Sequence, residues 1–175
     1  MKLSTITCGA LFYLLLGCGD SLSSLSDGSD DTGAALDKRA VQAGILPDPE
    51  KNDLAGRYET RGDLGVDKFC AVKRSGGSFD IGFLSVSGAD SKCEGTGTAT
   101  VKGERVDVVL NGQGDCSFTA QHDGFALKFP AVIDTGCSSY CSEQASFSAT
   151  HYFMIEPGNA AARETLGRDI ERLCH

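Results

Sequence analysis

The chain has 175 residues, which gives room for one domain with appendages, and its formal charge at pH 7 is −8. An acidic chain without a basic cluster argues against electrostatic binding to nucleic acid, so we expect no nucleic-acid partner. The eight cysteines exceed ordinary usage, and their meaning depends on the compartment in which the protein resides.

The N-terminus has the features of an export signal. Lys2 precedes an apolar run, Ile6 to Leu16, which is too short for the ~20 residues of a membrane-spanning helix. The run ends in Leu15-Leu16-Gly17-Cys18, which resembles the lipobox of bacterial lipoproteins. This resemblance implies that residues 1–17 are a signal peptide and that Cys18 is lipidated. The protein would then face the periplasm on a lipid anchor, and Gly19 favours the outer membrane over the inner membrane.

Residues 18–52 read as a flexible tether between this anchor and the folded part. Most of the segment 19–36 consists of Ser, Asp and Gly and has too few apolar residues to fold by itself. The segment Asp37 to Gly44 could form a short helix, and Pro47 and Pro49 end any continuation.

Residues 53–157 predict an all-β domain of antiparallel strands. Apolar and polar residues alternate in Phe79/Ile81/Phe83 and in Val106/Val108, as in half-buried strands. Eight short strands separated by Gly-bearing turns predict a small meander barrel, with a flattened sandwich as the alternative. The predicted strands are Gly56–Thr60, Lys68–Lys73, Phe79–Val86, Lys92–Val101, Arg105–Leu110, Cys116–His122, Ala126–Phe129 and Ser146–Ile155.

Residues 158–175 predict a C-terminal helix docked on the barrel. Ala162, Leu166, Ile170 and Leu173 would form one apolar stripe, and Gly167 would weaken the helix by about 1 kcal/mol relative to Ala.

Six cysteines remain beyond Cys18, and an even number in a small exported domain predicts three disulfides. The sequence leaves all 15 pairings open. A metal site built from Cys137, Cys141, Cys174 and His175 is the alternative, but its spacing does not fit structural zinc. We therefore expect neither a metal nor a cofactor. The six cysteines are Cys70, Cys93, Cys116, Cys137, Cys141 and Cys174.

One motif suggests catalysis. Asp134-Thr135-Gly136 follows an apolar stretch and resembles the catalytic loop of aspartic peptidases, and Asp169 lies in a segment that resembles the second signature of retroviral-type peptidases. Two carboxylates that share one proton could activate a water molecule. The 41 residues after Asp134 are too few for the flap and strands of that family. The pattern Asp-x-x-Cys recurs at Asp67 and Asp90 as turn chemistry, so we expect no catalytic residues.

From about residue 44 onward the chain resembles an uncharacterised family of alphaproteobacterial lipoproteins. The resemblance rests on Leu54-Ala-Gly-Arg-Tyr-Glu59, Phe69-Cys-Ala-Val72, Cys137-x-x-x-Cys141 and the terminal Leu173-Cys174, and it includes all six cysteines of the mature chain. It implies disulfides but no activity. A looser similarity of architecture relates the predicted barrel to periplasmic inhibitors of lysozyme and proteases.

The sequence thus predicts a lipid-anchored, non-catalytic binding or inhibitor-like module. Its partner would be an envelope protein or a small ligand, bound by loops at one barrel end, with Tyr140 as an exposed aromatic anchor beside Glu143. The alternatives are a structural envelope lipoprotein without a discrete site and a hydrolase that uses Asp134.

Overall fold

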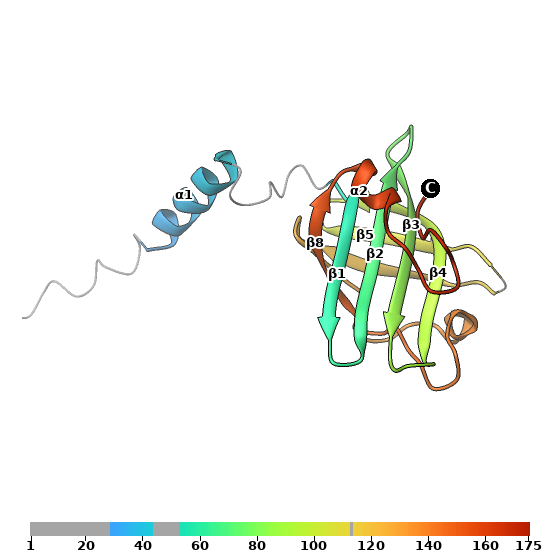
Figure 1. The fold of residues 1–175 in the computed structure, drawn as a ribbon. Coiled ribbons are helices and arrows are strands. Elements are labelled where there is room, and N and C mark those ends of the chain that lie inside the picture. The colour runs from blue at the N-terminus through green and yellow to red at the C-terminus, as the bar shows by residue number, and fades with distance from the viewer. Residues whose placement is uncertain (1–28, 44–52, 113) are drawn as a thin grey trace, which may run out of the picture.

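The computed structural model describes residues 29–43, 53–112 and 114–175, and these residues contain one closed antiparallel barrel (Figure 1). Each strand pairs with the next along the chain, and the last pairs with the first, so the sheet has no free edge. The all-β prediction is confirmed, with a barrel rather than a sandwich. The strands are β1 (Gly56–Gly62), β2 (Gly65–Lys73), β3 (Ser78–Val86), β4 (Lys92–Lys102), β5 (Arg105–Leu110), β6 (Ser117–His122), β7 (Ala126–Lys128) and β8 (His151–Pro157).

The meander topology separates two barrel ends. The connections β1–β2, β3–β4, β5–β6 and β7–β8 lie at one end, which we call the loop end. The chain enters β1 from Asp53 at the opposite end, which also holds the remaining turns and the short helix α2 (Asn159–Arg163); we call it the entry end.

The barrel interior is filled by aromatic rings, and two of them come from the β7–β8 connection rather than from a strand. Phe129 and Phe147 are only 3% and 2% exposed. The ring of Phe129 lies 4.8 Å from that of Phe118 and 5.1 Å from that of Tyr152, and the ring of Phe147 lies 4.7 Å from that of Phe83 (centroid distances). Edge-on and tilted aromatic pairs at these distances are stabilising. The long connection at the loop end is therefore fixed to the core at both of its ends.

The predicted C-terminal helix is wrong beyond its first turn and a half. Helix α2 ends at Arg163, and the following residues run as an irregular segment, 164–175, across the outer face of β2, β3 and β4 (Figure 1). Leu166, a member of the predicted stripe, is 52% exposed, whereas Leu173 is buried. Leu173 packs into a second apolar cluster outside the barrel, made of Cys70, Val72, Leu84, Val86, Ala162, Leu173 and Cys174. Tertiary contacts to β2–β4 override the local helical pattern.

Most strands differ from the prediction by one to three residues at one end, and two boundaries, the starts of β8 and of the N-terminal helix, differ by more. Strand β8 begins at His151 rather than at Ser146, because Phe147 turns into the barrel and Ala149 adopts a left-handed backbone with φ of 56°. Helix α1 spans Ser29–Gln42, longer than the short helix predicted from Asp37, and includes part of the segment expected to be flexible. The predicted signal peptide, residues 1–17, and the predicted lipidation site Cys18 lie outside the described residues.

Candidate functional site

The six cysteines form three disulfides, and two of them lie at the loop end. Cys137, within the 3₁₀ helix η2 (Thr135–Tyr140), pairs with Cys116, which directly precedes β6. Cys141, which directly follows η2, pairs with Cys93 of β4. The third disulfide joins Cys70 to Cys174 on the outer face of the barrel. The cysteines that the metal alternative would need are therefore all in disulfides.

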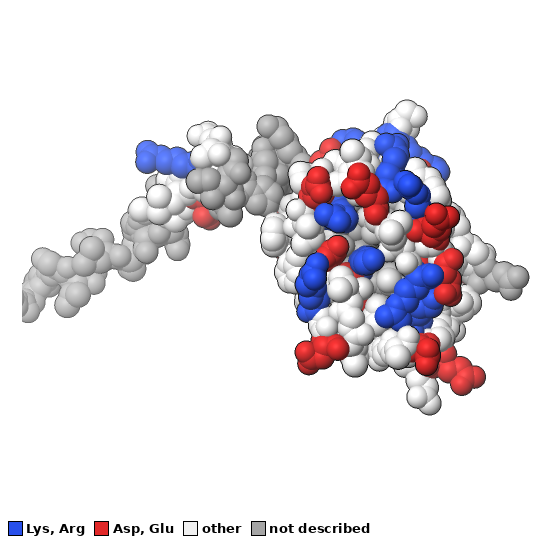
Figure 2. All heavy atoms as spheres, viewed as in Figure 1, with Lys and Arg blue, Asp and Glu red and all other residues white. Residues whose placement is uncertain are grey.

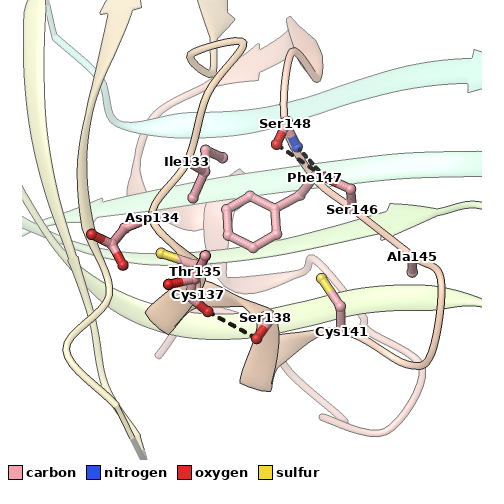
Figure 3. Close-up of a pocket in the computed structure, with 10 residues that line it drawn as sticks. All are labelled: Ile133, Asp134, Thr135, Cys137, Ser138, Cys141, Ala145, Ser146, Phe147 and Ser148. Atoms are coloured by element: carbon pink, nitrogen blue, oxygen red, sulfur yellow. Dashed lines mark hydrogen bonds between the residues drawn. The ribbon is translucent and has the colours of Figure 1, made fainter.

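Residues 130–150, which we call the stapled loop, combine these two disulfides with the buried Phe147. Backbone hydrogen bonds add to this fixation, because Ser142 N donates to the Lys92 carbonyl (2.9 Å) and Ala149 N donates to the Pro130 carbonyl (2.9 Å). The stapled loop is thus held by covalent, apolar and hydrogen-bonded contacts at several points along its length. Figure 3 shows where Cys137, Cys141 and Phe147 lie in it.

The segment that precedes η2 is exposed although its flanks are fixed. Val132 is 86% exposed, the largest exposed fraction among the large apolar side chains of the described residues. Phe129 on one side and Cys137 on the other are both buried. An apolar side chain therefore projects into solvent from a segment anchored on both sides.

The stapled loop also holds backbone strain. Gln144 (φ of 65°) and Ala149 (φ of 56°) are the non-glycine residues with positive φ among the described residues. A residue with a Cβ in this conformation costs on the order of 1–3 kcal/mol and persists where its surroundings impose it. Such strain is often found in ligand-binding loops, so the stapled loop is the candidate site.

A cavity of about 150 Å³ lies within the stapled loop (Figure 3). Phe147 and Ile133 supply apolar walls, and the remaining lining combines Thr and Ser side chains with Asp134, Ala145 and two disulfide-bonded cysteines. The serine hydroxyls have partners, since Ser138 Oγ donates to the Thr135 carbonyl (2.8 Å) and Ser146 Oγ lies 3.0 Å from Ser148 Oγ. The volume is below the 300–1,000 Å³ of ordinary small-molecule pockets and suits a single inserted side chain.

The two acidic residues of the peptidase-like motifs have separate structural partners. Asp134 caps η2, because its Oδ1 accepts a hydrogen bond from Gly136 N (2.8 Å). Asp169 forms an ion pair with Lys92 on the outer face of the barrel. The two carboxylates line different cavities, so the structure does not assemble them into one site. These contacts agree with the interpretation of Asp134 as a turn residue.

The residues predicted as a binding surface lie at the loop end, but Tyr140 is placed differently from the prediction. Its ring packs against Gly95 and Gly112, and its hydroxyl oxygen is enclosed, so Tyr140 is half-buried rather than an exposed anchor. Burial raises the pKa of the Tyr140 hydroxyl. Glu143 is exposed. Sequence reasoning missed Val132, because Ala131-Val-Ile stands out in the sequence only as the apolar stretch before Asp134, and only the fold shows Val132 at the surface.

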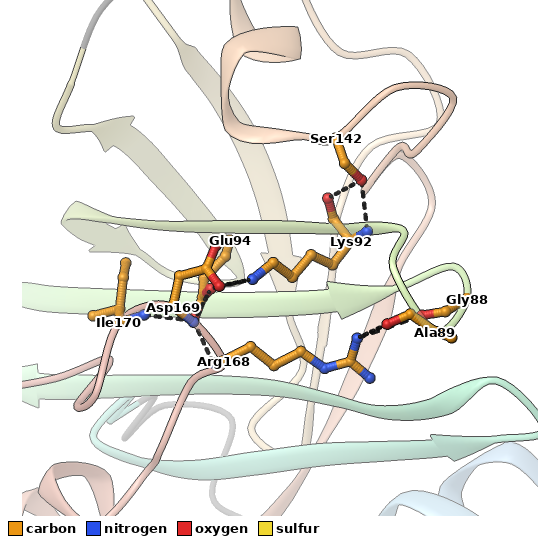
Figure 4. A network of polar contacts seen from close by, with 8 residues as sticks. All are labelled: Gly88, Ala89, Lys92, Glu94, Ser142, Arg168, Asp169 and Ile170. Carbon is orange, nitrogen blue, oxygen red and sulfur yellow. Dashed lines mark hydrogen bonds and ion pairs between the residues drawn. The ribbon is translucent and has the colours of Figure 1, made fainter.

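A polar network fixes segment 164–175 to β4 (Figure 4). The Glu94 side chain is only 5% exposed, and its carboxylate accepts hydrogen bonds from the backbone N–H groups of Arg168 (2.7 Å), Asp169 (2.9 Å) and Ile170 (3.3 Å). Lys92 Nζ lies 3.3 Å from the same carboxylate. Figure 4 shows the Arg168 guanidinium reaching the carbonyl of Ala89 (3.0 Å) in the β3–β4 turn. Both carboxylate oxygens of Glu94 therefore accept from backbone N–H groups of segment 164–175, which is a structural role.

A buried polar pair lies inside the entry end. The Tyr58 hydroxyl donates to the Leu54 carbonyl (3.0 Å) and lies 3.2 Å from His122 Nε2. Because the hydroxyl has only one proton, His122 Nε2 donates to the Tyr58 oxygen. Burial lowers the pKa of His122 and raises that of Tyr58, so both side chains are neutral at pH 7.

The surface over β1–β4 carries acidic and basic side chains interspersed (Figure 2). Many are paired, as in Lys73–Asp53 (2.9 Å) and Arg57–Glu156 (3.4 Å). This face therefore presents no single-sign patch to a charged partner.

The described helices, α1 and α2, are each too short to be candidates for a membrane span. Within residues 29–43, 53–112 and 114–175, no group of three or more His, Cys, Asp or Glu side chains is arranged to hold a metal ion. Comparisons of the chain with known protein families, with curated proteins and with solved structures found no match.

Proposed function

We propose that this protein is a lipid-anchored binding module of the periplasm that inhibits or captures another envelope protein with its stapled loop. The exposure of Val132 on a segment fixed at both flanks is the observation that carries this proposal. The export signal and lipobox-like sequence ending at Cys18 support the location.

The physical reason is preorganisation. A flexible loop loses about 0.5–1.5 kcal/mol of entropy for each side chain that binding immobilises, and a loop already held in its bound shape avoids much of this loss. Two disulfides and the buried Phe147 hold the stapled loop in one conformation, and they impose the strained backbone of Ala149. Inhibitors that insert a loop into the cleft of a target share this property.

The chemistry of the loop defines the partner. The segment Ala131–Ile133 is apolar, and Val132 projects furthest from it, which fits an apolar pocket in a protein cleft. The cavity of about 150 Å³ behind this segment can accept one side chain of the partner in return. A protein surface with a pocket and a protruding residue matches both features better than a diffusible small ligand.

The test is site-specific photocrosslinking in intact envelopes. A photoreactive amino acid replaces Val132, and a matched control carries it at Val109, a 54% exposed residue on the barrel wall. We expect a discrete adduct from position 132 only. Excess protein with the native Val132 should compete for the partner and abolish this adduct. The Val132→Arg variant should need at least tenfold more protein for the same competition.

The other outcomes separate the alternatives. Equal crosslinking of abundant envelope proteins from positions 132 and 109 would support a structural lipoprotein and would refute the stapled-loop proposal. Proteolysis of an envelope protein that disappears in a folded Asp134→Asn variant would show the hydrolase instead.

A further inference from the structure

Three exposed large apolar side chains, which we call the patch, lie on β8 and on the turn that precedes its neighbour β7, toward the entry end of the barrel. Phe125, in the β6–β7 turn, is 51% exposed, and Phe153 and Ile155, on β8, are 40% and 53% exposed. The rings of Phe125 and Phe153 lie 6.1 Å apart (centroid distance). Phe153 and Ile155 are two residues apart on β8, and both are exposed, whereas Tyr152 is buried and Met154 half-buried; Ile155 lies where the register of β8 against β1 shifts. Single exposed apolar residues are common, but a cluster indicates a contact surface.

The patch lies next to the point where the chain enters the barrel. Phe153 pairs with Glu59 of β1, and β8 continues to Pro157, which pairs with Gly56. The residue after Pro157 donates a backbone hydrogen bond to the Ala55 carbonyl (2.8 Å). The patch and the N-terminal connection thus share the same side of the entry end.

From this position we infer that Phe125, Phe153 and Ile155 contact the lipid bilayer to which the chain is anchored. The inference rests on the lipid anchor of the proposed function. Asp53 is 35 residues beyond Cys18, so the tether reaches at most about 120 Å even when fully extended. Confinement near the membrane raises the effective concentration of the patch at the bilayer, so a contact that is weak in solution becomes populated.

The charges beside the patch favour apolar insertion over electrostatic binding. Lys128 Nζ lies 3.5 Å from the Asp123 carboxylate, and Arg57 pairs with Glu156 (3.4 Å). Because each of these cations has an acidic neighbour, the rim of the patch offers no net positive charge to anionic headgroups. The contact should therefore form on neutral phosphatidylcholine and should not weaken with salt.

Because the sequence contains no Trp, a single introduced Trp is the only indole in the protein and reports on its own surroundings. Phe125→Trp places a single indole in the patch, Phe153→Trp is a second reporter, and Leu64→Trp is the matched control. Leu64 is 61% exposed in the β1–β2 turn at the loop end. Each lipidated full-length variant is incorporated into phosphatidylcholine vesicles that contain brominated acyl chains, and flotation of the vesicles measures anchoring separately from fluorescence.

We expect the indole at position 125 or 153 to be quenched by at least half, with blue-shifted emission, in both low and high salt. The indole at position 64 should be unaffected. Flotation without quenching at positions 125 and 153, or equal quenching at position 64, would overturn the membrane contact and leave the anchor intact. Failure of the lipidated wild-type protein to float would overturn the anchor and, with it, this inference.

Discussion

The Glu94 carboxylate gives the sharpest test of how the structure is held together. Glu94→Gln keeps the volume of the side chain but removes its charge and replaces one acceptor oxygen with an NH₂ donor. The amide oxygen can still accept from Arg168 N and Ile170 N, which both bond to Oε1. The NH₂ group would face two donors, the Asp169 N–H and the Lys92 ammonium, which bond to Oε2.

The magnitude follows from these contacts. Hydrogen bonds to a charged group contribute about 1.5–3 kcal/mol each, and the substitution removes two of them and weakens the others. Water can solvate the released segment 164–175, which offsets part of the loss. We therefore expect the free energy of unfolding to fall by about 3 kcal/mol. Asp169→Asn is the matched control, because its side chain is 78% exposed and an exposed pair contributes less than about 1 kcal/mol.

Two measurements check this reasoning. Guanidinium unfolding of the oxidised protein gives the stability of each variant, and hydrogen exchange gives the local protection of the amides of residues 168–170. Glu94→Gln should lower both, and Asp169→Asn should change stability little. A loss in Glu94→Gln no larger than that in Asp169→Asn would refute the assignment of Glu94 as the anchor of segment 164–175, as would unchanged protection of those amides.

Two further predictions concern pH and backbone strain. Burial lowers the pKa of His122 in the folded state, so an unfolded imidazole binds a proton near its ordinary pKa of about 6.5 while the folded one does not. The free energy of unfolding should therefore fall as pH drops below about 6.5. His122→Gln should flatten this slope in melts between pH 7.5 and 5, and an unchanged slope would show that other groups cause it. Ala149→Gly should raise the melting temperature, since glycine adopts the φ of 56° without the Cβ penalty of roughly 1–2 kcal/mol. A lower melting temperature would mean that the loop does not constrain this residue.

The central strands could be predicted from the sequence because their pattern is local. In β5, Val106, Val108 and Leu110 face inward, while Asp107 and Val109 face outward, and the predicted bounds Arg105–Leu110 match the strand. The closing of the barrel followed from the number of strands and from the liability of free edges. These features depend on residues within a few positions of one another or on general rules of sheets.

The features that could not be predicted depend on residues distant in sequence. The spacing of Leu166 and Ile170 predicts a helix, but the backbone there bonds to Glu94, more than 70 residues earlier. The disulfide partner of each cysteine is likewise set by the fold, so all pairings remained open from the sequence. The exposure of Val132 depends on how the surrounding loop is fixed to the barrel, which no local pattern shows. Tyr140 was predicted to be exposed because the sequence does not show that its ring packs against Gly95 and Gly112.

The disulfides have a consequence for how the chain must be oxidised. They are nested: Cys116–Cys137, 21 residues apart, lies inside Cys93–Cys141, 48 apart, which lies inside Cys70–Cys174, 104 apart. Short loops close with the smallest entropy loss, and Cys70 is only 23 residues from Cys93. Oxidation in order of synthesis would join Cys70 to Cys93 and trap a non-native chain. The native pairing therefore requires either that the barrel folds before Cys70 is oxidised or that thiol–disulfide exchange corrects the Cys70–Cys93 bond, and among the three native bonds the innermost closes the shortest loop.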